Sequence, residues 1–135
     1  MQLTYARLDA SELQGATQAD YVVSLEADLR ILDDTRCIYD EPSFPVVELA
    51  RSLAKWLEQP DRPDFAFDSM SFEEVGAIVV RRADAGWIFS SVFKPNLESS
   101  PVDWAEVERS IGSFVARVDA DLRALGVDPD EVIRH

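Results

Sequence analysis

An alternation of apolar and polar residues in the first quarter of the chain constrains the fold more than any other feature. Successive side chains of a strand point to opposite faces, so a period of two predicts a strand with one buried and one solvated face. We therefore expect a long strand over residues 20–32 within an antiparallel sheet, the kind of sheet that commonly has one wet face. The apolar positions are Val23, Leu25, Ala27, Leu29 and Ile31, and the polar positions between them are Ser24, Glu26, Asp28 and Arg30.

Turn-forming residues predict two hairpins. Asp33, Asp34 and Thr35 separate the alternating run from a second alternation, so a hairpin is expected there, and the prolines at 42 and 45 are expected to end the sheet. The polar segment 9–18 fits either a loop or a short helical turn. The remaining strands are expected at residues 2–8, 36–41, 65–68, 75–82 and 86–94, the last two forming a hairpin with apolar residues on both faces.

Two helices are predicted from apolar residues that recur at spacings of three and four. The first covers residues 46–58. The second begins with Ser100 as N-cap and Pro101 at the first helical position and stops at Gly126, after which residues 128–131 cap a short final turn. The apolar stripes are Val46, Leu49, Ala50, Leu53, Trp56 and Leu57 in the first helix and Trp104, Val107, Ile111, Phe114, Val118, Leu122 and Leu125 in the second.

These elements predict a single domain of the α+β class over residues 1–135. We expect an antiparallel sheet of about five or six strands, in the order strand, strand, strand, helix, strands, helix. The two amphipathic helices each need an apolar surface, so both are expected to pack on one face of the sheet. A chain of 135 residues is long enough to bury one core without disulfides or metal.

The charge balance narrows the choice of partners. Twenty-six acidic residues against thirteen basic ones give a formal net charge of -13, and a stripe of Lys and Arg that nucleic acid would need is missing. A spanning apolar run and a secretory leader are also missing, which predicts no membrane partner and a cytoplasmic location. An acidic surface attracts a basic protein at a rate that falls with salt, so such a protein is the expected partner; plain solubility is the alternative interpretation.

The residues that most cofactor and hydrolase chemistry requires are missing. Cys37 stands alone and is expected to be a packed strand residue rather than a nucleophile or a metal ligand. His135 is the single histidine, which removes catalytic triads and histidine-ligated metals. The five glycines are isolated and offer no phosphate cradle. We therefore expect no cofactor, no metal and no catalytic residue.

The candidate partner-binding site lies between residues 64 and 74, where acids alternate with aromatic residues and methionine. Phe and Met supply contact area, and the acids steer and pair with Lys and Arg of a partner. Turn structure and paired catalytic carboxylates are the competing interpretations. Two other acidic runs, 119–121 and 128–131, are assigned to a solvated helix face and a helix cap, and Glu26 and Asp28 are the next interface candidates. The site consists of Asp64, Asp68, Met70, Phe72, Glu73 and Glu74.

Two segments carry a resemblance to a known family. Tyr-Asp-Glu-Pro-Ser-Phe-Pro-Val-Val-Glu-Leu-Ala at residues 39–50 and Asp-Phe-Ala-Phe-Asp-Ser-Met-Ser-Phe-Glu at residues 64–73 resemble a family of small acidic bacterial domains of unknown function. The resemblance covers nearly the whole chain and implies no site. More loosely, the size, acidity and α+β layout are similar to those of immunity proteins that neutralise bacterial toxins.

Three functional hypotheses follow. The first is a non-enzymatic acidic binding protein, in its most concrete form an immunity-type inhibitor that occludes a basic toxin site. The second is a carboxylate-dependent enzyme for a small molecule, which requires a concave pocket with two acids. The third is a homo-oligomeric interaction module, in which the apolar hairpin 75–94 forms a homodimer surface.

Overall fold

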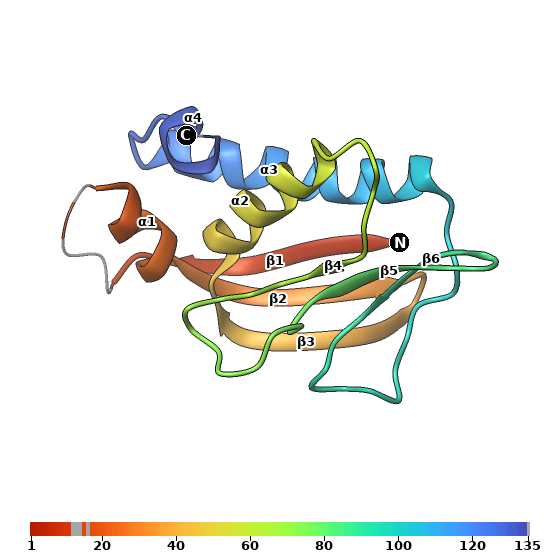
Figure 1. Ribbon diagram of the computed structural model, residues 1–135. Coiled ribbons are helices and arrows are strands. Elements are labelled where there is room, and N and C mark those ends of the chain that lie inside the picture. The colour runs from red at the N-terminus through yellow and green to blue at the C-terminus, as the bar shows by residue number, and fades with distance from the viewer. Residues whose placement is uncertain (12–14, 16, 135) are drawn as a thin grey trace.

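The fold contains two three-stranded antiparallel sheets and four helices within residues 1–11, 15 and 17–134, the part of the chain that the computed structural model describes (Figure 1). The α+β class and the antiparallel pairing are as predicted. Sheet A consists of β1 (Gln2–Asp9), β2 (Glu26–Asp33) and β3 (Arg36–Phe44), and sheet B of β4 (Phe65–Ala66), β5 (Val79–Ala83) and β6 (Gly86–Ser90). The helices are α1 (Gln18–Ser24), α2 (Val46–Leu57), α3 (Trp104–Ala124) and α4 (Pro129–Ile133).

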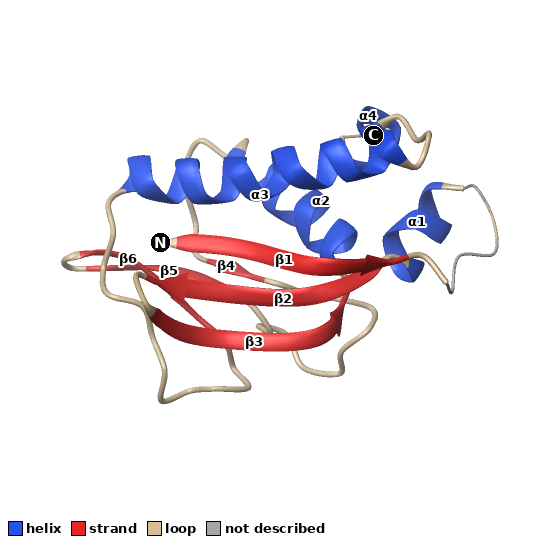
Figure 2. Ribbon diagram, turned by 180° about the vertical axis from the view of Figure 1, so that it is seen from behind, coloured by secondary structure: helices blue, strands red, loops and turns tan. Residues whose placement is uncertain are grey.

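Sheet A has one buried face and one outer face, as the alternation predicts. Leu29 of β2 and Tyr5 of β1 are buried on the side of α2 and α3. On the outer face, Arg30 lies in register between Thr4 of β1 and Asp40 of β3. Figure 2 shows β1, β2 and β3 side by side, with α3 running along the β1 side of sheet A.

The prediction of one sheet with five or six strands is wrong. The turn after α2, which holds Pro60 and Pro63, leads the chain away from sheet A, and Phe65 then pairs with Val80 of β5. The chain after β6 returns to the same strand, where Val102 pairs with Trp87. The strands of sheet B therefore pair with one another and with the segment that follows β6. Side chains of both sheets nevertheless belong to one hydrophobic core.

The prediction of a strand over residues 20–25 is also wrong, because α1 occupies residues 18–24. Thr17 caps this helix: its side chain accepts the backbone N–H of Asp20, and the Asp20 carboxylate accepts the backbone N–H of Thr17. This reciprocal capping box satisfies two donors that a helix start leaves free. The strand begins only at Glu26. Residues 12–14 and 16 of the undecided segment 9–18 lie outside the described residues.

The long C-terminal helix begins later than predicted. Ser100 and Pro101 precede an extended bridge between Val102 and Trp87, and the Asp103 carboxylate caps α3 by accepting the Glu106 N–H at 2.9 Å. Other boundaries differ by a little: α2 ends one residue earlier than predicted, and β5 and β6 form a shorter hairpin. The end of α3 agrees with the prediction, because Gly126 follows its cap with a φ of 79°. Asp128 caps α4, also as predicted. β3 continues through Pro42 to Phe44, and Cys37 on it is exposed rather than packed.

The free edge of β1 lies against α3. Arg109 and Ser110 both donate to the Met1 carbonyl, at 2.8 and 3.1 Å. About two turns further along α3, Arg117 donates to the Thr4 hydroxyl at 3.1 Å. These bonds give backbone and side-chain acceptors of an edge strand partners from the same chain.

Three tryptophans join α2, β6 and α3 at one end of the molecule. Trp56 and Trp87 are buried, and the half-buried Trp104 lies 5.5 Å from the first ring and 5.2 Å from the second, measured between centroids. Arg62 stacks on Trp104 and Arg82 on Trp87, at 4.4 and 4.9 Å. Of the two tryptophans in the predicted apolar stripes, Trp56 is therefore a core residue and Trp104 only in part, and Trp87 joins them from β6.

Candidate partner-binding site

Exposed apolar side chains gather in two loops. One loop lies between β4 and β5 and the other directly after β6, and Figure 1 shows the course of both. Among the described residues, six large hydrophobic side chains are exposed, and five of them belong to these loops. Clustering of this kind marks interaction sites more reliably than single exposed apolar residues do. The exposed fractions of these five side chains are 75% for Met70, 54% for Val75, 40% for Phe93, 39% for Leu97 and 38% for Val92. The sixth residue, Leu125, is the C-cap of α3.

Direct contacts join the two loops into one surface. The ring of Phe72 lies 5.7 Å from Phe93 and 5.4 Å from the buried Phe44 of β3. The backbone N–H of Val92 donates to the Gly76 carbonyl at 2.9 Å. We call the surface formed by Met70, Phe72, Val75, Val92 and Phe93, with the acids of the first loop, the two-loop surface.

Gly76 is required where the loops meet. Its φ of 105° lies in a region that other residues rarely adopt, and a Cβ atom would come within 2.7 Å of Val92 Cγ1. Its N–H donates to the Phe67 carbonyl at 2.9 Å, so the glycine is bonded to both loops. The close approach of the two loops depends on the missing side chain.

A buried carboxylate of α2 accepts two hydrogen bonds from the first loop. Glu48, in the first turn of α2, is 7% exposed and accepts the Ser69 hydroxyl at 2.5 Å and the Met70 backbone N–H at 3.3 Å. The Ser69 oxygen in turn accepts the Ser71 N–H at 3.0 Å. Both carboxylate oxygens of a core residue are thus used by the loop that presents Met70 and Phe72.

The structure brings five of the six predicted site residues into one loop. Asp68, Met70, Glu73 and Glu74 are exposed on this loop, and Phe72 between them in the sequence is half-buried. The sixth, Asp64, has a local backbone role: its carboxylate accepts the Arg82 N–H of β5 at 2.9 Å.

The second loop lies where the apolar pattern predicts a strand. Val92 and Phe93 fall within the predicted strand 86–94, whereas β6 ends at Ser90. The available signal was the turn-forming pair Pro95 and Asn96 just beyond them. Nothing in the spacing along the chain would have placed Phe93 against Phe72.

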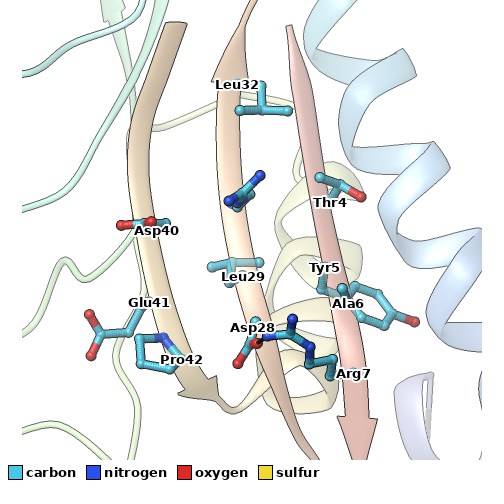
Figure 3. Close-up of a pocket in the computed structure, with 11 residues that line it drawn as sticks. Thr4, Tyr5, Ala6, Arg7, Asp28, Leu29, Leu32, Asp40, Glu41 and Pro42 are labelled. Carbon is cyan, nitrogen blue, oxygen red and sulfur yellow. Dashed lines mark hydrogen bonds and ion pairs between the residues drawn. The ribbon is translucent and has the colours of Figure 1, made fainter.

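A second surface is an open groove of about 530 Å³ on the outer face of sheet A (Figure 3). Asp28, the alternative interface candidate, lines it and forms a 3.0 Å ion pair with Arg7. Arg30, Asp40 and Glu41 also line it, so the groove carries charges of both signs. It contains none of the six predicted site residues.

The acidic run 119–121 is not a solvated face as predicted. Asp119 is buried and forms an ion pair with Arg134 at 2.7 Å, and Asp121 accepts the hydroxyl of Tyr5. Both carboxylates therefore hold elements of the fold together.

None of the helices in the described part of the chain combines the length and the apolar character that a membrane span requires.

The fold and the two-loop surface define a small α+β protein whose most distinctive exposed feature is an apolar surface among acids. The chain belongs to the family described as Domain of unknown function (DUF7878), whose model matches residues 1–124. This confirms the resemblance to an uncharacterised family. Neither a curated protein nor a solved structure matches the chain.

Proposed function

We propose that this protein is a non-enzymatic binding protein that recognises a basic protein partner through the two-loop surface. The observation that carries the proposal is the gathering of five of the six exposed large hydrophobic side chains, among the described residues, in two touching loops. Interfaces commonly combine aromatic and methionine anchors at the centre with polar residues at the rim. Met70 and Phe93 are suited to be such anchors.

The charge of the surface selects the partner. Asp68, Glu73 and Glu74 are exposed beside the apolar residues, on a chain with a formal net charge of -13. Two copies of this chain would bring these like charges together, which opposes a homodimer through this surface. A partner with Lys and Arg around an apolar centre fits both the contacts and the field.

An immunity-type inhibitor is the most concrete form of this proposal. The two-loop surface would cover a basic active site by steric and electrostatic occlusion, without chemistry of its own. The carboxylate enzyme is less well supported, because Asp68, Glu73 and Glu74 are exposed on a loop and outside the groove of sheet A. An enzyme of that kind would need such acids in a concave, partly desolvated pocket.

Site-directed photo-crosslinking in native lysate tests the proposal. A photoreactive amino acid replaces Met70 in one variant and Val75 in a second, and Leu125, which is 46% exposed, in the matched control. We expect one basic protein to be crosslinked from both loop positions and not from 125, with a yield that falls as salt rises. Equal crosslinking from 70 and 125, or an acidic crosslinked species, would overturn the proposal.

The inhibitor form makes a further demand on the crosslinked protein. It must be a toxic enzyme with a basic active site, and one equivalent of this protein must abolish its activity. If the purified pair binds and the enzyme stays active, the binding function stands and the inhibitor form is wrong.

A further inference from the structure

We infer that Glu48 is the positioning residue of the two-loop surface: its buried carboxylate fixes the loop that carries Met70 and Phe72 in the conformation that binds the partner. This inference rests on the proposed function and names a residue that does not itself touch the partner. Its basis is the pair of bonds from Ser69 and Met70 to the two oxygens of Glu48.

The carboxylate depends on the loop for its stabilisation. Glu48 is 7% exposed, and the ion pairs among the described residues do not include it. A buried charge without a cation is strongly unfavourable unless hydrogen bonds compensate it. The hydroxyl of Ser69 and the N–H of Met70 supply that compensation. Movement of the loop away from α2 would leave the carboxylate without these donors.

The same bonds restrict the loop. Ser69 is 4% exposed although it lies between the exposed residues Asp68 and Met70. From this buried point, bonds from Ser71 and Phe72 run back to the hydroxyl and carbonyl of Ser69, at 3.0 and 3.4 Å. A short chain of hydrogen bonds therefore links the first turn of α2 to the anchor residues.

Pre-ordering of this kind raises affinity, because a loop that is already in its bound conformation loses less conformational entropy on binding. When only a fraction of the molecules hold the binding conformation, the apparent affinity falls by that fraction. The Glu48 carboxylate thus acts on binding through the population of one loop conformation.

Ser69→Ala is the decisive variant, because it removes one donor to Glu48 and leaves the net charge unchanged. Ser71→Ala is the matched control: the same substitution two residues on, at an exposed side chain. Glu48→Gln tests the other partner of the bond, and the double variant with Ser69→Ala tests whether the two act as one unit.

The first measurement is amide hydrogen exchange in the free protein. The reporter is the Gly76 N–H, which bonds to Phe67 and not to either altered side chain. We expect Ser69→Ala and Glu48→Gln to raise its exchange about tenfold or more relative to amides of α3, since loss of a buried bond to a charged group has effects of this size. The Ser71→Ala variant should exchange like the parent. A merely structural role would raise exchange in the loop and in α3 together.

The second measurement is binding of a defined probe, the peptide acetyl-Lys-Lys-Trp-Lys-Lys-amide, followed by amide chemical shifts. The matching Glu peptide controls for charge. We expect the Lys peptide to shift amides of both loops, and Ser69→Ala to weaken its binding about threefold or more while Ser71→Ala leaves it unchanged.

The outcomes separate this inference from the proposed function. If Gly76 stays protected in Ser69→Ala, or if its exchange rises and peptide binding is unchanged, the positioning role is wrong although the surface still binds. If the parent protein shows no shift of loop amides with the Lys peptide, the proposed function fails, and the exchange data alone decide whether Glu48 orders the loop.

Discussion

The hydroxyl of Tyr5 on β1 donates a hydrogen bond of 2.5 Å to the carboxylate of Asp121 on α3. The two residues are 116 positions apart in the sequence. Arg117, one turn earlier on the same helix, places its guanidinium 4.1 Å from the centre of the Tyr5 ring. Together these contacts tie the first strand to the longest helix.

Tyr5→Phe should lower the free energy of unfolding by about 1–2 kcal/mol, because it leaves a half-buried carboxylate without its donor while the ring packing is retained. Urea denaturation of the variant measures the change. Tyr21→Phe, which removes a hydroxyl from a half-buried ring of α1, is the control and should change stability by less. Equal losses in both variants would show that the Asp121 bond contributes little.

Stability should fall in alkaline solution. Burial raises the pKa of Tyr39 to about 12, and burial together with the bond to Asp121 also raises the pKa of Tyr5. The unfolded chain loses these protons from pH 10 and the folded protein does so only later, so stability is complete below about pH 10 and decreases as the pH rises toward 12 and beyond. Urea unfolding from about pH 8 to about pH 11 measures this slope. Tyr5→Phe and Tyr39→Phe should each flatten it, and an unchanged slope in both variants would contradict the assignment.

Glu106 should account for part of the loss of folding stability at low pH. Its hydrogen bond from Arg109, aided by the amino group of Met1, lowers its pKa to about 2. A lowered pKa stabilises the fold above the unfolded value of 4.5, and this stabilisation is lost as the pH falls from 4.5 to about 2. Glu106→Gln should therefore flatten the stability curve in that window, and added salt should do the same to a smaller degree. Glu108→Gln removes the same charge two residues away and is the control.

Two glycine substitutions should have opposite signs. Gly76→Ala places a methyl group 2.7 Å from Val92 Cγ1 at a φ of 105°, so we expect a loss of about 1–3 kcal/mol and separation of the two loops. Gly112→Ala on α3 meets nothing within 4 Å and should stabilise the protein by about 0.5–1 kcal/mol. Thermal unfolding of both variants measures the two changes in stability. A neutral Gly76→Ala would mean that the loops separate at no cost in stability.

The acids of the two-loop surface should control association rate. Replacing Asp68, Glu73 and Glu74 together by Asn, Gln and Gln should slow binding of the crosslinked partner several-fold at low salt, with a smaller change in dissociation. Stopped-flow association at about 0.05 and 0.3 M salt measures this, because the screening length shrinks from about 14 to 6 Å. The variant should fold normally, since all three side chains are exposed. An unchanged association rate would move the interface to the groove that contains Asp28.

Local sequence patterns predict most helices and strands. They are wrong where pairing with a distant segment determines the backbone conformation, or where one segment fits both the helix and the strand period. The stripe over residues 46–57 identifies α2 because its packing face is continuous in the sequence. The N-cap signal at Ser100 was overridden by the pairing of Val102 with Trp87, which keeps that segment extended. α1 was missed because residues 21–25 fit both periods; the capping pair Thr17 and Asp20 was the signal that separates them.

The candidate site was half visible in the sequence. Met70, Phe72 and the three acids stand close together along the chain, so composition alone identified their loop. Phe93 lies twenty-one residues further on and reaches Phe72 only because Gly76 lets the loops approach. Glu48 was hidden for a related reason: a glutamate in a first helical turn normally indicates solvent or a cap, and only the folded loop buries it.

The tryptophan cluster determines what optical experiments on this protein can detect. Its three indoles are inclined to one another by 52° to 77°, close enough for their excited states to couple, and they are all the tryptophans of the chain. Emission and the near-ultraviolet dichroism of these rings therefore report the junction of α2, β6 and α3. A change confined to sheet A, to α1 or to the loop of Met70 would leave the tryptophan signal unchanged. Tryptophan spectra would then be those of the native protein even after that loop had opened.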